Sequence, residues 1–319
     1  MGLSKNRVTA SSHSKLIVLG EHSVVYGKPA IAIPFPSIHA TASVEEHLHS
    51  KNAKGIILKC HYFEGKLELA PAKLSGIVAC IHATIEALEK HPVNMTIHLD
   101  STIPIGRGLG SSAAVAIAIV KSLYTYYGEP LSQSKLMELV HIAETHAHGN
   151  PSGIDMVAAS SEFPIWFEKG KDTLPILLGA QLHIVVADTG RIGDTRAAVE
   201  SIRENYSLNP VATKHSIDLL GELTYMAKDA LINGKIELLG NYMNLAHIEL
   251  DKLGVSDHII DNLVEIAQNN GALGAKLTGG GRGGCVLVLA ENKKHAEKLS
   301  IILKEAGAYQ TWNFETEGS

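Results

Sequence analysis

The pattern of apolar and polar residues changes repeatedly along the chain between strand-like and helix-like segments. Short runs that are continuously apolar, or in which apolar and polar residues alternate, predict strands, whereas apolar residues three or four positions apart predict helices. Strands are expected at 8–10, 15–19, 30–33, 39–44, 56–60, 93–99, 162–167, 174–178, 183–187, 275–278, 286–290 and 308–314. Helices are expected at 71–90, 111–127, 131–148, 195–205, 212–232, 235–251, 256–269 and 293–305.

The order of these elements predicts an α+β protein of two domains. Strands alternate with pairs of helices, and a chain of 319 residues is long enough to form two cores. The polar, turn-forming segment Lys169-Gly170-Lys171-Asp172 is the best candidate for the boundary. We therefore expect an N-terminal domain of residues 1–172 and a C-terminal domain of residues 173–319.

Composition and charge narrow the class of protein. Hydrophobic residues make up 45% and charged residues 19% of a chain with a formal net charge of −5, which is typical of a soluble protein without a nucleic-acid-binding surface. The three cysteines, Cys60, Cys80 and Cys285, are too far apart for a zinc knuckle and fit a reducing compartment. The first residues lack an apolar signal core, and no apolar run reaches the roughly 18 residues of a membrane span. We expect a cytoplasmic protein that does not enter a membrane.

A glycine-rich segment between the expected strand 93–99 and the expected helix 111–127 is the strongest candidate for a ligand site. Its three glycines within five residues allow the backbone to turn tightly and to approach a ligand closely. The helix that follows offers unpaired N–H groups and the positive end of its dipole, a combination that binds anions such as phosphate. Ser111 and Ser112 stand where a helix cap or a hydroxyl ligand of a metal would be. By itself, the loop is also compatible with a tight connection that ends in a good cap.

Two common nucleotide-binding motifs do not fit this loop. A Walker A loop would end in Gly-Lys-Ser/Thr, which is absent here. A dinucleotide fingerprint needs a parallel strand that ends in Asp or Glu roughly 20 residues further on. Here the helix runs into Tyr127-Gly128-Glu129-Pro130 and then into another helical pattern, so a nicotinamide oxidoreductase is excluded.

Three further segments carry polar or glycine-rich patterns beside apolar strands. Lys15 begins the apolar strand 15–19 and Glu21-His22 follow it, although charged residues there are often solvated strand ends. The segment 149–155 is a shaped turn that presents Ser152 and Asp155, where an Asp often serves as an N-cap or Asx-turn. The loop 279–284 contains five glycines and Arg282, and a hairpin-like connection also explains it.

In combination, these motifs resemble the GHMP kinases, a superfamily that includes galactokinase, homoserine kinase, mevalonate kinase and phosphomevalonate kinase. The resemblance covers residues 15 to 284 and is carried by Lys-x-x-x-x-Gly-Glu-His-x-Val-Val-Tyr-Gly-x-Pro-Ala, Pro-x-Gly-x-Gly-Leu-Gly-Ser-Ser-Ala, Gly-Asn-Pro-Ser-Gly-x-Asp and Lys-Leu-Thr-Gly-Gly-Gly-x-Gly-Gly. The first motif is most similar to that of mevalonate kinases. Galactokinases carry Asp-Tyr after Gly-Glu-His, and homoserine kinases generally lack the equivalents of Lys15 and Asp155. Arg107 stands where mevalonate kinases often have a small residue, and a side chain at this position could point outward without harm.

The resemblance implies a fold, a reaction and partners. The fold would be the two-domain GHMP kinase fold, with an N-terminal domain like domain 2 of ribosomal protein S5, a ferredoxin-like C-terminal domain and the active site between them. The reaction would transfer phosphate from ATP, with Mg²⁺, to the C5 hydroxyl of mevalonate in isoprenoid biosynthesis, and the enzyme would be a homodimer. Phosphomevalonate kinase and a catalytically silent ATP-binding sensor are the alternatives. A silent sensor would be expected to lack Lys15, Glu144 or Asp155, and all three are present.

The resemblance also assigns roles to residues. Asp155 would be the catalytic base, and Lys15 would help the hydroxyl to lose its proton while keeping the Asp155 carboxylate ionised. Ser112 and Glu144 would bind Mg²⁺, provided that helix 131–148 packs beside helix 111–127. The glycine-rich segment 104–110, which would bind phosphate, is called the phosphate loop. The loop 279–284 would brace it. The nucleotide would be bound by Pro104, Ile105, Gly106, Arg107, Gly108, Leu109, Gly110, Ser111, Ser112 and Ala113. The acceptor substrate would be bound by Glu21, His22, Ser152, Thr195 and Arg196, of which Arg196 suits its carboxylate.

Overall fold

The structure, a computed structural model, describes residues 7–46, 55–90, 94–149 and 151–317. The chain divides into two compact units, and each unit is assembled from separate stretches of sequence. The first unit comprises Met1–Ser14, Ile38–Pro104 and Gly110–Ser160, and the second comprises Lys15–Ser37, Ile105–Leu109 and Ser161–Ser319. The chain passes from one unit to the other within strands β1 (Val8–Leu19) and β2 (Ala30–Glu46). A domain boundary at residue 172 stays a prediction.

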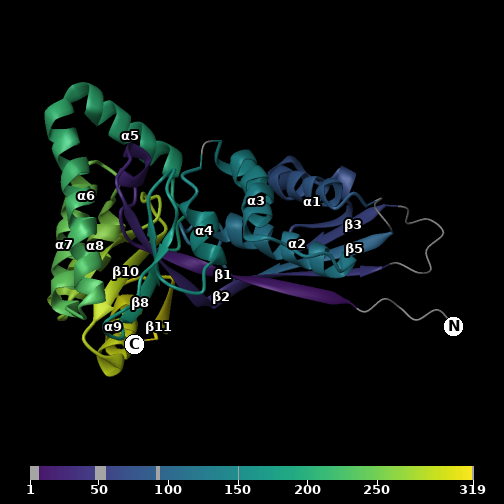
Figure 1. The fold of residues 1–319 in the computed structure, drawn as a ribbon. Helices are drawn as coiled ribbons and strands as arrows, with labels where there is room; N and C mark the ends of the chain where they lie inside the picture. Colours follow the sequence, from purple (N-terminus) through teal and green to yellow (C-terminus); the bar gives the residue numbers. More distant parts are fainter. Residues whose placement is uncertain (1–6, 47–54, 91–93, 150, 318–319) are drawn as a thin grey trace. The chain divides into compact units, whose positions relative to one another are not determined.

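In the first unit, part of a mixed sheet carries three long helices. The sheet contains β2, β3 (Ile56–Cys60), β4 (Phe63–Lys66) and β5 (Met95–Ser101) in the order β4-β3-β5-β2, and only the β3–β5 pair is parallel among these neighbours. Figure 1 shows the helices α1 (Ser75–Ala87), α2 (Ser111–Tyr127) and α3 (Gln133–His148) beside this sheet. A short helix, α4 (Ile154–Ser160), packs on α2 and α3. The short 3-10 helices Leu67–Leu69 and Ala72–Leu74 precede α1.

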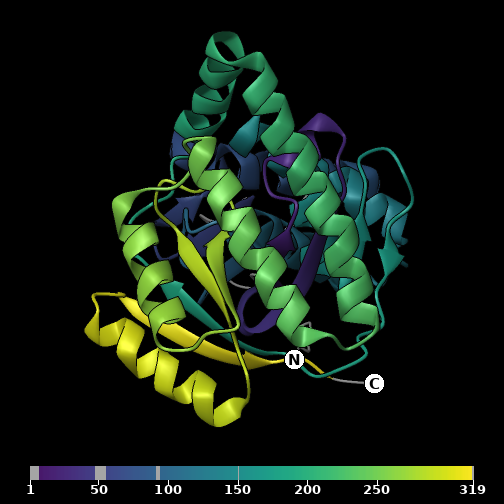
Figure 2. The same cartoon turned by 90° about the vertical axis from the view of Figure 1, so that its left-hand side faces the viewer.

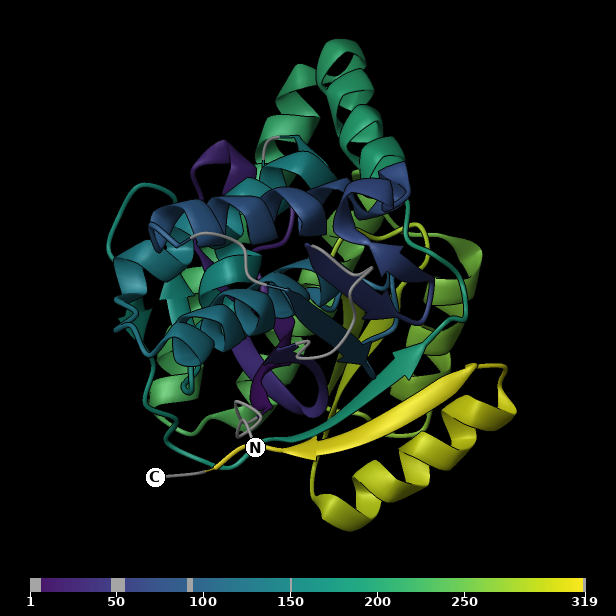
Figure 3. The same cartoon turned by 90° about the vertical axis from the view of Figure 1, so that its right-hand side faces the viewer.

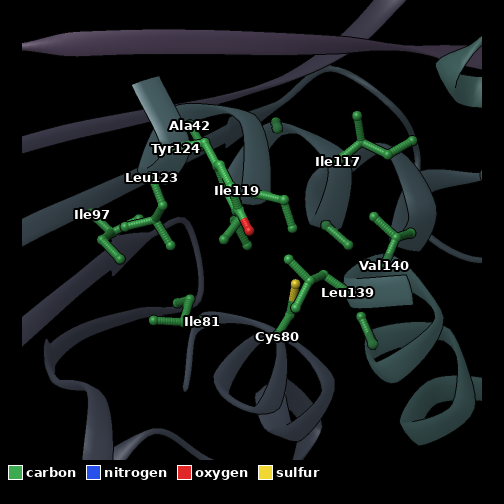
Figure 4. Close-up of a cluster of buried hydrophobic side chains, with 14 of the residues drawn as sticks. Ala42, Cys80, Ile81, Ile97, Ile117, Ile119, Leu123, Tyr124, Leu139 and Val140 are labelled. Atoms are coloured by element: carbon green, nitrogen blue, oxygen red, sulfur yellow. The ribbon is translucent and has the colours of Figure 1, made fainter. Parts of the chain in front are cut away.

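One apolar core holds the sheet and helices of the first unit together (Figure 4). Helix α2 lies at its centre because it is buried on almost every side, as its small and apolar composition allows. The sheet, α1 and α3 contribute the surrounding side chains. Those labelled in the figure are Ala42, Cys80, Ile81, Ile97, Ile117, Ile119, Leu123, Tyr124, Leu139 and Val140.

The second unit contains a four-stranded antiparallel sheet in the order β11-β8-β10-β9. Its strands are β8 (His183–Asp188), β9 (Gly274–Thr278), β10 (Cys285–Ala290) and β11 (Gln310–Glu315). Strands β9 and β10 are buried along their whole length, and β10 has a continuously apolar sequence. The first part of β2 pairs with β6 (Ile165–Phe167), and β6 pairs with β7 (Leu174–Pro175).

Five long helices complete the second unit. They are α5 (Thr195–Leu208), α6 (Pro210–Ile232), α7 (Ile236–Lys252), α8 (His258–Asn269) and α9 (Lys293–Glu305). Helices α6 and α7 lie side by side in Figure 2, whereas α9, in yellow, packs against β8 and β11 in Figure 3. A 3-10 turn, η1 (Ser23–Tyr26), contacts α6.

The predicted α+β class is confirmed, and several element boundaries differ from the expectation. Strand β1 continues through residues 11–14, which the sequence did not predict. The buried Ser12 hydroxyl in this part donates a hydrogen bond to Ala159 O at 2.8 Å, which satisfies a polar side chain inside the strand. Strand β4 and helix α4 were not predicted, and β7 is shorter than the expected 174–178. The described residues do not include the first six residues, Val93 or Asn150. No helix in the described ranges is long and apolar enough to cross a membrane.

Candidate active site

The phosphate loop runs directly into the N-terminus of α2. The residue before the helix is Gly110, whose φ of 73° lies in the left-handed region, and no side chain caps the helix. Hydrogen bonding within the helix begins with Ala114 N, which donates to Gly110 O at 3.0 Å. Because the amides of the first helical turn precede that bond and point along the axis, they are suited to an anion.

Helix α3 packs against α2, as the predicted metal site requires. Glu144 lies in α3 with only 2% of its surface exposed, while Ser112 is half-buried in the first turn of α2. No group of three His, Cys, Asp or Glu side chains gathers as a metal site in the described part of the chain. A hydroxyl and a carboxylate nevertheless fit Mg²⁺, since this cation usually takes its remaining ligands from phosphates and water.

Asp155 lies in the first turn of α4 rather than in a turn between elements. A carboxylate is favourable there because it meets the positive end of the helix dipole. Ser152 precedes the helix, and its hydroxyl accepts a hydrogen bond from Ile154 N at 3.4 Å. Ser152 and Asp155 are both half-buried, and α4 packs on the two helices that carry Ser112 and Glu144.

In the second unit, Lys15 is attached to the phosphate loop by both its side chain and its backbone. Its ammonium group donates to Gly108 O at 3.0 Å, and its backbone N–H donates to Leu109 O at 3.3 Å. Lys15 is 1% exposed, and Leu109 is also buried, whereas Ile105 is 57% exposed. The start of the apolar strand 15–19 is therefore a buried position and not a solvated strand end.

The phosphate loop rests on two other loops of the second unit. A Cβ atom on Gly108 would lie only 3.0 Å from Gly279 Cα, so the two backbones approach too closely for a side chain. Gly193 N donates to Gly106 O at 2.7 Å, which joins the phosphate loop to the loop that follows β8. The contact between Gly108 and Gly279 is consistent with the bracing role expected for residues 279–284.

The Arg107 side chain points inward and not outward. Its side chain is 12% exposed, and its Nε donates to Asp188 Oδ1 at 2.7 Å. The loop therefore carries a mostly buried cation that has its own counterion.

Lys276 is a buried residue that reasoning from the sequence missed. It forms an ion pair with Glu21, and the two side chains are 0% and 2% exposed. Burial raises the pKa of Glu21 and lowers that of Lys276, while their mutual attraction opposes both shifts. Glu21 Oε2 is buried with no hydrogen-bond partner among the described residues. A signal was present, because Lys276, like Lys15, is a lysine within a short apolar strand.

His22 is held as a neutral imidazole. Its Nε2 lies 3.1 Å from Gly280 O, which can only accept, so Nε2 carries the proton. Burial lowers the pKa of His22 to about 4. At neutral pH, Nδ1 is therefore an acceptor, which suits a substrate hydroxyl better than a carboxylate. The backbone of His22 has a φ of 60°, a value uncommon outside glycine.

The remaining candidates lie at the start of α5. Thr195 is the first residue of this helix, and its hydroxyl lies against the Cα of Gly280, where any added side-chain atom would collide with it. Arg196 belongs to the same helix, but its side chain lies outside the described residues. Asp194 caps the helix by accepting from Ala197 N at 2.8 Å. Thr195 is thus placed beside the loop that carries the partner of His22.

Comparison with known proteins links both halves of the chain to one family. Residues 76–162 match the GHMP kinases N terminal domain, and residues 227–308 match the GHMP kinases C terminal domain. The chain is 37% identical to the mevalonate kinase of Pyrococcus furiosus over 315 residues, which covers 92% of each chain.

Solved structures agree with this relationship. Mevalonate kinase from methicillin-resistant Staphylococcus aureus is 31% identical, with a TM-score of 0.72 over 97% of this chain and 98% of that one. Mevalonate kinase from L. major, solved with R-mevalonate, has a TM-score of 0.84 over 100% of this chain and 97% of that one. At 23% identity, the L. major enzyme supports the fold alone.

Proposed function

This chain belongs to the GHMP kinase family and, within it, to the mevalonate kinases, and we propose that it transfers the terminal phosphoryl group of ATP to the C5 hydroxyl of mevalonate. The observation that carries the proposal is the attachment of Lys15 to the phosphate loop, with its ammonium group 3.0 Å from Gly108 O. Phosphoryl transfer depends on positioning and on stabilising charge, and a cation held at a phosphate loop supplies both.

In this proposal, the first unit supplies the base and the metal ligands. The Asp155 carboxylate accepts the proton of the C5 hydroxyl, or orients that hydroxyl, as its oxygen attacks the γ-phosphorus and the bond to the β-phosphate breaks. Ser112 and Glu144 hold Mg²⁺, which when bound neutralises charge on the phosphates. The amides at the start of α2 hold phosphate oxygens.

Other residues supply cationic and neutral polar groups. Lys15 stabilises the negative charge that spreads over the transferring group. The His22 Nδ1 accepts a hydrogen bond from a hydroxyl of mevalonate, while Thr195 and Ser152 offer further hydroxyls and Arg196 binds the carboxylate. Lys276 is already matched in charge by Glu21. That pairing argues against an acceptor with a phosphate of its own, because phosphomevalonate would need additional unmatched cations.

A coupled assay of ADP release tests the proposed function. Purified protein with Mg·ATP is offered mevalonate, phosphomevalonate, galactose and homoserine in parallel, and the product is identified by mass spectrometry. We expect turnover with mevalonate alone and 5-phosphomevalonate as the product. Turnover with phosphomevalonate would support the rival kinase, and mevalonate binding without ADP release would support a silent sensor.

Two lysine variants make the assay specific to the site. Lys15→Met removes the buried cation from the phosphate loop and should abolish turnover. Lys28→Met is a matched control, because Lys28 forms a partly exposed ion pair with Asp218 at 2.6 Å and should leave turnover unchanged. Equal activity of the two variants would contradict the role given to Lys15.

A further inference from the structure

Arg107 is the one side chain between the two glycines at the centre of the phosphate loop, and it points into the second unit. Gly106 and Gly108 have φ values of 70° and 74°, in the region that L-residues rarely occupy. The Arg107 Nε donates to Asp188 Oδ1 at 2.7 Å, and the two side chains are 12% and 1% exposed. The loop is therefore attached through a charged side chain of its own, at its centre.

Asp188 is itself held rigidly at the end of β8. It pairs in register with Cys285 of β10 and with Gln310 of β11, so it lies in an interior strand of the four-stranded sheet. Its carbonyl oxygen accepts from Tyr309 N at 2.8 Å. An attachment to Asp188 consequently ties the loop to a rigid strand rather than to another loop.

The same carboxylate oxygen also holds the loop that leads to Thr195. Asp188 Oδ1 accepts a second hydrogen bond from Gly190 N at 2.8 Å. One oxygen atom thus joins the phosphate loop to the loop 190–195. The backbone bond from Gly193 N to Gly106 O, 2.7 Å long, joins the same two loops a second time.

Arg107 has no substitute for Asp188 among the described residues. Its Nη1 is buried and has no hydrogen-bond partner there, so loss of the Asp188 charge would leave the guanidinium buried without a counterion. Breaking the pair should therefore move the loop, because a buried cation without a counterion is more stable when water can hydrate it.

We propose that Arg107 and Asp188 are positioning residues whose ion pair sets the geometry of the phosphate loop and of the loop 190–195 at the same time. The inference rests on the proposed function. Amides bind a phosphate well only when they are oriented beforehand, and small displacements lower the rate of phosphoryl transfer. One carboxylate would then influence the affinity for the nucleotide and the affinity for the acceptor.

Calorimetry with Mg·ADP, in the absence of any acceptor, tests the first half of this proposal. Arg107→Ala and Asp188→Asn should each weaken Mg·ADP binding about tenfold, and the double variant should be no weaker than the worse single variant, because one interaction is lost in all three. Arg107→Lys keeps the charge without the Nε donor and should recover part of the affinity. It also provides a measurement if Asp188→Asn does not fold.

Steady-state kinetics test the second half. Asp188→Asn should raise KM for both ATP and mevalonate. Glu249→Gln is the matched control, because Glu249 is a buried carboxylate that accepts from the Ser216 hydroxyl at 2.7 Å and belongs to none of these loops. This control should lower the melting temperature and leave Mg·ADP affinity and both KM values unchanged.

Two results would overturn the proposal. One is wild-type affinity for Mg·ADP in folded Arg107→Ala and Asp188→Asn proteins that are merely less stable, and the other is additive losses in the double variant. If the wild-type protein binds Mg·ADP but does not phosphorylate mevalonate, the proposed function fails, and the comparison of Mg·ADP affinities still tests the ion pair.

Discussion

Lys276 and Glu21 form an ion pair within the second unit, although the two residues are 255 positions apart in the chain. Glu21 follows β1, and Lys276 lies in β9, a strand that is entirely buried. Both residues belong to sequence motifs of the family, and Lys15 lies close enough to affect the pKa of each. The pair thus joins the first and the last of the four family motifs in one charged cluster.

Removing one member of this pair should destabilise the protein. Glu21→Gln or Lys276→Met should lower the free energy of unfolding by about 3–5 kcal/mol, because each leaves a buried charge without its partner. The double variant should cost less than the sum of the two, since it leaves no unpaired charge. Urea denaturation measures all three values. If the double variant loses as much unfolding free energy as the two single variants together, the two residues are not energetically coupled.

Asp155→Asn should lower kcat by about 10²–10⁴-fold while Mg·ADP still binds with nearly wild-type affinity. The reason is that the amide keeps the shape of the carboxylate but cannot accept the proton of the acceptor hydroxyl. The assay of ADP release and calorimetry provide the two measurements. Asp172→Asn, a change at an exposed position, is the control. Loss of nucleotide binding instead of turnover would assign Asp155 a different role.

Glu144→Gln should raise the Mg²⁺ concentration needed for half-maximal activity by at least about tenfold, because a neutral amide is a poorer ligand for a hard cation. Titration of activity against Mg²⁺ at saturating ATP measures this requirement. Glu138→Gln changes an exposed carboxylate, 61% exposed, on the same helix and should have no effect. An unchanged Mg²⁺ requirement in Glu144→Gln would remove Glu144 from the metal site.

The pH dependence of stability should carry a contribution from His22. The pKa of His22 is about 4 in the folded protein and 6.5 in the reference state, so the unfolded chain binds more protons between these values. Stability from His22 is therefore lost as the pH falls, by about 2 kcal/mol between about pH 6.5 and about pH 4.5. The raised pKa of Glu21 acts in the opposite direction, which makes a reference variant necessary.

His22→Asn is that reference, since Asn keeps a short polar side chain and has no group that titrates in this range. Unfolding free energies of both proteins are measured by denaturation at several pH values. The wild-type protein should lose stability relative to His22→Asn as the pH falls through this range. Parallel pH profiles would mean that His22 titrates normally in the folded state.

Local sequence signals predicted those elements that have clear ends. Helix α2 was predicted with both of its boundaries because Gly110 and Gly128 adopt the left-handed conformation on either side of it. Helix α4 was missed because it has only seven residues and follows Pro151 and Gly153, which indicate a turn. Strand β4 was missed because it is short and only partly buried. Local patterns do not report pairing with a distant strand.

In the candidate site too, the sequence indicates residues within short motifs but does not indicate contacts between residues far apart in the chain. Lys15 and Asp155 lie within motifs, and the sequence was enough to propose them as site residues. The partner of Glu21 and the inward direction of Arg107 could not be proposed from the sequence, because they depend on contacts with Lys276 and Asp188, far away in the chain. A buried charge needs a counterion, but the sequence does not indicate which residue provides it.

The division of the second unit among three separate stretches has a consequence for chimeric proteins. Joining the first 160 residues of this chain to the remainder of a homologue would keep Glu21 and Arg107 but replace Lys276 and Asp188, with which they form ion pairs. A functional hybrid would need several junctions, at least one of them inside β1 and another inside β2. Recombination between related genes at a single crossover should therefore seldom yield an active enzyme, and these two units are expected to be inherited together.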